Sequence, residues 1–125
     1  YREYLYDDDS ARFYFELMVK YCLDLPAKHP NTKFIFLPNT EYARTIAKKH
    51  FTQGMLFDFA FETVSNNEPE STGPIGEVWD HRPGHLNPTN HELIKNLVKD
   101  AINKYDSRIV DVDLTQFNQK PNEQF

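Results

Sequence analysis

Two short apolar runs separated by one helical segment constrain the fold of this chain most. The runs occupy residues 33–37 and 55–61, and turn-forming residues bound them, as is typical of buried strands. Between the runs, Thr40 can cap a helix that extends to about His50, with an inner face of Tyr42, Ile46 and Ala47. A strand–helix–strand unit of this length predicts two parallel strands. We therefore expect an α/β fold, a three-layer sandwich in which helices flank a short parallel sheet.

Helices are also predicted on either side of this unit. The segment from about Ser10 to Leu25 has apolar residues at helical spacing, and we expect a well-buried helix packed on the sheet. Its predicted buried stripe is Tyr14, Leu17, Met18 and Tyr21, widened by Phe13, Phe15, Val19 and Cys22. A later helix can begin at Asn87-Pro88, or two residues further on at a capping box. Its predicted buried face is Leu93, Ile94, Leu97, Val98, Ala101, Ile102 and Tyr105.

The remaining segments complete a single unit. Residues 62–76 are polar and predict a long surface loop, whereas the alternating pattern of 108–114 predicts an edge strand. Residues 115–125 read as a polar tail. We expect one α/β domain over 1–125, or the C-terminal portion of such a domain. The first residue is Tyr1 rather than Met, so a processed product or a piece of a longer protein is expected.

The composition narrows the classes of partner. An apolar share of 39% and an aromatic share of 14% argue against disorder. The net charge of −5 argues against nucleic acid as the main partner. No apolar run approaches the ~20 residues of a membrane span. The single cysteine, Cys22, excludes an internal disulfide and favours a reducing, cytoplasmic compartment.

The stretch 80–91 concentrates the chemistry of the chain. It holds Asp80 together with His81, His85 and His91, and it leads directly into the predicted C-terminal helix. A helix N-terminus stabilises nearby negative charge, so this is a favourable place for an anion or a developing oxyanion. We therefore predict a functional site in this stretch.

The run His85-Leu86-Asn87-Pro88-Thr89-Asn90-His91 resembles the final block of the SGNH (GDSL-type) hydrolases. In that family a catalytic His is followed by Leu-Asn, a capping turn and the C-terminal helix. The strands ending at Leu37-Pro38 and Phe57-Asp58 also resemble the later part of the family, so the resemblance covers roughly residues 10 to 105.

The resemblance implies a catalytic role for His85 and Asp80. His85 would be the general base, and Asp80 would be the carboxylate that orients its ring. The implied reaction is hydrolysis or transfer of an acyl ester on a small acylated carbohydrate or lipid. We predict no cofactor and no metal for this reaction.

The sequence departs from the family pattern in two ways. The family usually has its acid three residues before the His, whereas Asp80 precedes His85 by five. The chain also lacks a Gly-Asp-Ser turn for the nucleophile, and its four glycines all lie from Gly54 onward. We expect either an upstream segment or second chain that supplies the serine and completes the fold, or a degenerate, non-catalytic member. On either account the isolated chain should hydrolyse no ester.

Two other classes of function stay open at this point. Asp80, His81, His85 and His91 have side chains suited to zinc or another transition metal, although their spacing matches no known motif. The aromatic N-terminus and the acidic run 7–9 are alternatively compatible with a non-catalytic binding or interaction module. Asp58, at a strand end, is a second candidate for an acid in the site. His91 is expected to be structural, and His29 and His50 to be exposed to solvent.

Overall fold

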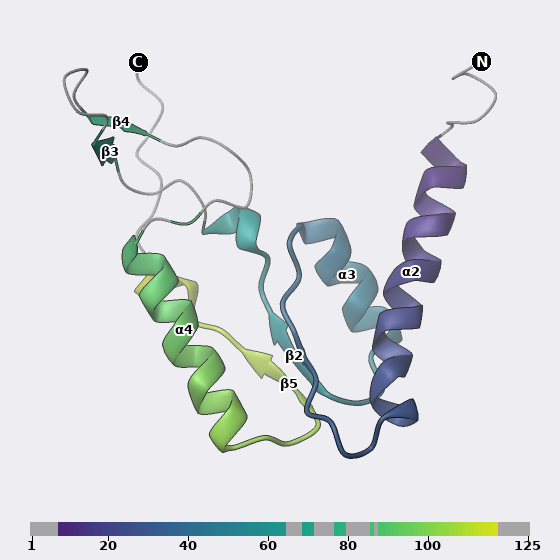
Figure 1. Ribbon diagram of the computed structural model, residues 1–125. Coiled ribbons are helices and arrows are strands. Elements are labelled where there is room, and N and C mark those ends of the chain that lie inside the picture. Colours follow the sequence, from purple (N-terminus) through teal and green to yellow (C-terminus); the bar gives the residue numbers. More distant parts are fainter. Residues whose placement is uncertain (1–7, 65–68, 72–76, 80–85, 87, 118–125) are drawn as a thin grey trace.

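In the part of the chain that the structure describes, the protein is an α/β domain with three helices and a three-stranded, all-parallel sheet (Figure 1). The computed structural model describes residues 8–64, 69–71, 77–79, 86 and 88–117. Along the chain, the elements that build this domain are α2 (Asp8–Lys28), β1 (Ile35–Phe36), α3 (Glu41–His50), β2 (Met55–Asp58), α4 (Pro88–Asn103) and β5 (Arg108–Asp111).

The sheet has the order β1-β2-β5, so β2 is its central strand. Ile35 of β1 is in register with Met55 of β2, and Leu56 of β2 is in register with Ile109 of β5. Both pairings are parallel. The predicted parallel strand–helix–strand unit and the edge position of the last strand are therefore confirmed.

Alternate residues of β2 pack into two different helical layers. Met55 and Phe57 belong to a core cluster with Ile94 and Ala101 of α4. Leu56, between them, packs with two buried residues of the other layer, Leu23 of α2 and Ala47 of α3. Because successive side chains of a strand point to opposite faces, α4 covers one face, and α2 with α3 covers the other (Figure 1). This is the predicted three-layer arrangement.

Short regular elements lie within and just beyond residues 62–76, the stretch predicted to be a loop. A 3-10 turn, η1 (Phe61–Thr63), follows β2, and β3 (Pro69–Ser71) pairs with β4 (Glu77–Trp79). This pair is antiparallel, with Glu70 in register with Val78. The polar sequence of the stretch has no apolar alternation, which is why the pattern did not indicate a hairpin.

The predicted burial of α2 is wrong for most of its stripe. Tyr14 is 68% exposed, Met18 is 57% exposed and Tyr21 is 61% exposed. The helix is apolar around much of its circumference, and only the side facing α3, which includes Leu23, is covered. Tyr42, predicted to point inward from α3, is also 44% exposed, and it stacks on Phe15 at 5.4 Å between ring centroids.

The C-terminal part of the described chain returns to the core. A 3-10 turn, η3 (Leu114–Gln116), places Phe117 in the α4-side cluster, where its ring stacks on Phe59 at 6.0 Å between centroids. On α4, the predicted inner face is largely confirmed, but Ile102 is 44% exposed. None of the helices in the described ranges is long and apolar enough to cross a membrane.

Candidate functional site

The candidate site lies at the edge of the sheet where the parallel strands end. The Phe61 N–H donates to the Pro38 carbonyl oxygen at 3.0 Å, and the Glu62 N–H donates to the Asn39 carbonyl oxygen at 3.0 Å. These two bonds hold the segment after β1 against the segment after β2. Functional side chains of α/β proteins gather at this edge because several chain segments meet there.

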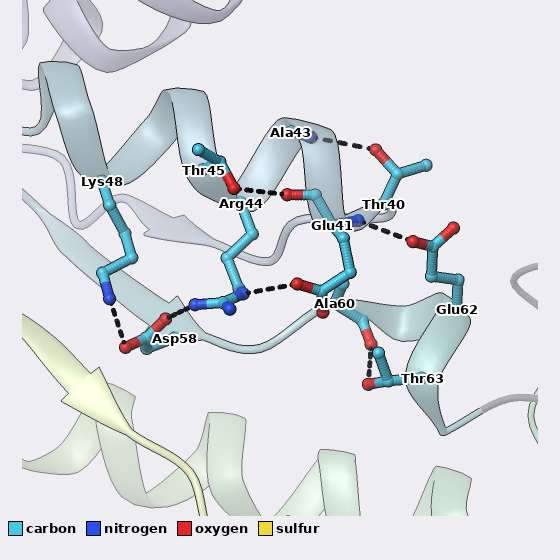
Figure 2. A network of polar contacts seen from close by, with 10 residues as sticks. All are labelled: Thr40, Glu41, Ala43, Arg44, Thr45, Lys48, Asp58, Ala60, Glu62 and Thr63. Atoms are coloured by element: carbon cyan, nitrogen blue, oxygen red, sulfur yellow. Dashed lines mark hydrogen bonds and ion pairs between the residues drawn. The ribbon is translucent and has the colours of Figure 1, made fainter.

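The N-terminus of α3 opens at the same edge (Figure 2). The Thr40 hydroxyl accepts a hydrogen bond from the Ala43 N–H at 3.0 Å, which confirms Thr40 as the predicted cap. The Glu41 N–H donates to Glu62 Oε1 at 2.8 Å, so a carboxylate from η1 also occupies this helix end. Both contacts satisfy amide groups that a helix N-terminus leaves without an intrahelical partner.

Asp58 is the carboxylate that the structure places at the end of β2. Arg44 Nη1 lies 2.5 Å from Asp58 Oδ1, and Lys48 Nζ lies 2.9 Å from Asp58 Oδ2 (Figure 2). Arg44 Nε also contacts Glu41 Oε2 at 3.1 Å. Burial raises the pKa of Asp58, but the hydrogen bonds from Lys48 and Arg44 outweigh burial and leave this pKa below its ordinary value. Each Asp58 oxygen therefore binds a cation, which is the arrangement of a structural ion network rather than of a proton donor.

The start of α4 is fixed at this edge by a buried amide. Asn90 is fully buried, and its side-chain nitrogen donates to the Val64 carbonyl oxygen at 3.0 Å. Leu86 is half-buried and packs on the α4-side cluster. Leu86 and Asn90 thus attach the start of α4 to the core cluster and to the segment that follows β2.

The predicted catalytic residues themselves lie outside the described residues. These are His85 and Asp80. His81 also lies outside the described residues. Their roles stay predictions, and only the attachment of the following helix is described. His91 lies in the first turn of α4 and is exposed.

The histidine at the end of α3 was predicted to be exposed, and this prediction is wrong. His50 Nε2 lies 2.6 Å from Glu16 Oε1, and the imidazole is only 22% exposed. Hydrogen bonds from His50 and then Lys49 hold the pKa of Glu16 below its ordinary value. The contact joins α2 to α3, so His50 has a structural role. Its partner is 34 residues away, which is why local sequence did not reveal it.

Sequence reasoning also missed an apolar groove beside β1. It has a volume of about 260 Å³ and lies between α2, α3 and the sheet, with residues of β1, of β2 and of the segment after β1 in its lining. Its lining includes Met18, Val19, Cys22, Leu23, Phe36, Leu37, Pro38, Asn39, Ala43, Ala47 and Leu56. The apolar residues of α2 were visible in the sequence as a signal for burial, but not as a groove wall.

Among the described residues, no group of three or more His, Cys, Asp or Glu side chains is arranged to hold a metal ion. The predicted alternative ligand set rests mainly on residues beyond those described. Comparison of the chain with protein-family models, with curated proteins and with solved structures finds no match.

Proposed function

We propose that this chain is the His- and Asp-bearing part of an SGNH-type ester hydrolase or acyl-transfer domain. His85 is the proposed general base and Asp80 its proposed orienting carboxylate. One structural observation supports this proposal most. The Asn90–Val64 hydrogen bond attaches the first turn of α4 to the segment that follows β2, at the carboxyl edge of a parallel sheet. The start of α4, which directly follows the proposed catalytic residues in the sequence, therefore lies near the edge where α/β enzymes assemble their sites.

In the proposed reaction, the His85 imidazole takes the proton of a serine hydroxyl as that oxygen attacks an acyl ester. The imidazole then returns the proton to the leaving alcohol. The Asp80 carboxylate would hold the ring in the required tautomer and stabilise the imidazolium. The serine would come from an upstream segment or a second chain, because no Gly-Asp-Ser turn occurs in this sequence. The proposed substrates are small acylated carbohydrates or lipids.

The ion network at the end of β2 has a supporting role in this proposal. Asp58 binds Arg44 and Lys48, so it fixes α3 to β2 rather than taking part in proton transfer. At the carboxyl edge of the sheet, these ion pairs hold α3 against β2. The proposed catalytic residues precede α4 instead. A rigid support is what a positioned general base requires.

The test compares the protein expressed from its full open reading frame with the isolated 125 residues. Two readouts are used, hydrolysis of p-nitrophenyl acetate and labelling of a nucleophilic serine by a fluorophosphonate. We expect both from the full protein, and we expect His85→Ala to lower hydrolysis about 10²–10⁴-fold, the usual contribution of a general base. His91→Ala is the matched control, because His91 is an exposed histidine six residues further along the sequence.

Two results would contradict the proposal. Full activity in His85→Ala would show that His85 is not the general base. Ester hydrolysis by the isolated chain would show that the serine is not supplied from elsewhere. If a chelator abolished the activity and the fluorophosphonate labelled no serine, the metal alternative would be favoured instead.

A non-catalytic binding module is the second candidate, and a specific observation favours it. The groove beside β1 has a largely apolar lining, and α2 leaves five large apolar side chains exposed, of which Met18 also lines the groove. Exposed apolar patches often mark sites of interaction. Neither feature depends on His85 or Asp80.

A further inference from the structure

We infer that an exposed apolar stripe of α2 binds the same stripe of a second copy of this chain, with the two α2 helices antiparallel about a two-fold axis. The stripe consists of Tyr14, Leu17, Met18 and Tyr21, which are between 44% and 68% exposed. Its position, the order of its residues, the charges at the ends of α2 and the area left uncovered all support this arrangement. The proposed hydrolase chemistry does not depend on it.

The stripe lies on the side of α2 that faces away from α3 and the sheet. On the opposite side, buried Leu23 packs with Ala47 of α3 and Leu56 of β2. Leu23 is nine residues after Tyr14, and at about 3.6 residues per turn this separation places the two side chains on opposite sides of the helix. Figure 1 shows α2 as the outermost helix, beyond α3. The stripe is therefore accessible to another molecule.

The stripe has the same order of residue types when it is read in either direction. Tyr14 and Tyr21 are its aromatic ends, and Leu17 and Met18 are its aliphatic centre. Contact about a two-fold axis requires such self-complementarity, because the same surface is used on both copies. With the axis between Leu17 and Met18, each Tyr14 lies opposite Tyr21 of the other copy. This reversible order favours a second copy, since a partner of different sequence, an upstream segment included, gives no reason for it.

The charges at the two ends of α2 also favour an antiparallel pair. The acidic run 7–9 lies at the start of the helix in the sequence, and Lys28 is its last residue. The Lys28 ammonium lies 5.1 Å from the centre of the Tyr21 ring, so it is on the side of the stripe. An antiparallel pair brings Lys28 of one copy level with the acidic run of the other, whereas a parallel pair would bring like charges together. The helix dipoles have the same preference.

The uncovered area is that of a weak, reversible dimer. Phe13 borders the stripe and is 59% exposed. At about 150–250 Å² for a large side chain, Phe13 and the four residues of the stripe leave roughly 500–600 Å² in water. Covering this area on both copies would bury about 1,000–1,200 Å², which is at the lower end of specific interfaces. We therefore expect a Kd on the order of 10 µM.

The first test is cysteine cross-linking in the protein expressed from its full open reading frame, with Cys22→Ser as the background. In the antiparallel pair, the two copies of residue 17 are about 1.5 Å apart along the helix axis, and those of residue 14 are about 10 Å apart. A disulfide needs Cα atoms within about 7 Å. Under mild oxidation we expect Leu17→Cys to link to itself, and Tyr14→Cys to link to Tyr21→Cys when the two variants are mixed. Tyr14→Cys alone and the background alone should not link.

A matched pair of charge variants separates the stripe from other apolar surface. Leu17→Lys places two like charges beside the two-fold axis, and it should raise the Kd about tenfold or more, as measured by sedimentation velocity over a range of protein concentrations. Ile102→Lys is the control, because Leu17 and Ile102 are both 44% exposed and Ile102 lies on α4. It should leave the Kd unchanged. Circular dichroism checks that both variants remain folded.

Three outcomes would overturn the inference. The full protein could be a monomer that forms no cross-link while the isolated 125 residues dimerise, and an upstream segment would then be the occupant of the stripe. Tyr14→Cys could link to itself, which would show a parallel pair. Leu17→Lys could change the Kd no more than Ile102→Lys does, and the stripe would then lie outside the interface.

Discussion

The side-chain amide of Asn90 donates a hydrogen bond to the Val64 carbonyl oxygen at 3.0 Å, and Asn90 is completely buried. This contact joins the first turn of α4 to the residue just after η1. The two residues are 26 positions apart, and the stretch 80–87 lies between them in the sequence. The bond therefore attaches the helix that directly follows the predicted catalytic residues to the segment after η1.

Replacement of Asn90 by Ala should destabilise the fold. The substitution leaves the buried Val64 carbonyl without this donor and removes packed atoms, so we expect a loss of about 2–3 kcal/mol in the free energy of unfolding. Urea denaturation followed by circular dichroism would measure this loss. His91→Ala, at the exposed neighbouring position, should change stability by less than about 0.5 kcal/mol. Equal effects of the two substitutions would show that the buried bond contributes little.

Removal of the Asp58 charge should also destabilise the protein. Asp58→Asn keeps the side-chain size but leaves Arg44 and Lys48 without their shared carboxylate, so we expect a loss of about 1–3 kcal/mol. The matched control is Asp100→Asn, since Asp100 forms an exposed pair with Lys104 on α4. Such surface pairs contribute about 0–1 kcal/mol. If Asp100→Asn costs as much as Asp58→Asn in urea denaturation, the network has no special importance.

The same network predicts how stability depends on pH. The pKa of Asp58 is lower in the folded protein than its ordinary value of about 3.9. Its ion pairs therefore contribute fully above that value, and the contribution is lost as the pH falls through the folded pKa. We expect the free energy of unfolding to decrease from pH 5 to pH 3, and to decrease less in Asp58→Asn. Identical pH profiles for the two proteins would contradict this assignment.

Gly54, at the start of β2, should not tolerate a side chain. Its φ of 93° lies in the region that favours glycine, and an added Cβ would lie 2.8 Å from Phe36 Cε2 and 3.2 Å from the Phe34 carbonyl oxygen. We expect Gly54→Ala to lower the unfolding free energy by about 1–3 kcal/mol. Gln53→Ala, at the exposed preceding residue, is the control and should have little effect. Thermal unfolding that shifts equally in both variants would argue against strain at Gly54.

Only part of the functional site could be predicted from the sequence. The stretch 80–91 was identified by its residue types and by a family resemblance, and His85 and Asp80 stay predictions because they lie outside the described residues. Asp58 shows the limit of such reasoning. Its place at a strand end was readable, but its two cationic partners come from α3, and only their packing shows that Asp58 is structural.

The sequence by itself determined the local elements and their order. Helical spacing, the Thr40 cap and the short apolar runs act over neighbouring residues, so they predicted α3, α4, β1, β2 and the parallel sheet. The tertiary structure alone decided which side of α2 is covered. That helix is apolar on several sides, and Leu23 is buried because it packs against Ala47 of α3 and Leu56 of β2, whereas Tyr14 and Tyr21 stay exposed. Periodicity reports what a helix face prefers, whereas contacts between distant segments decide which preference is satisfied.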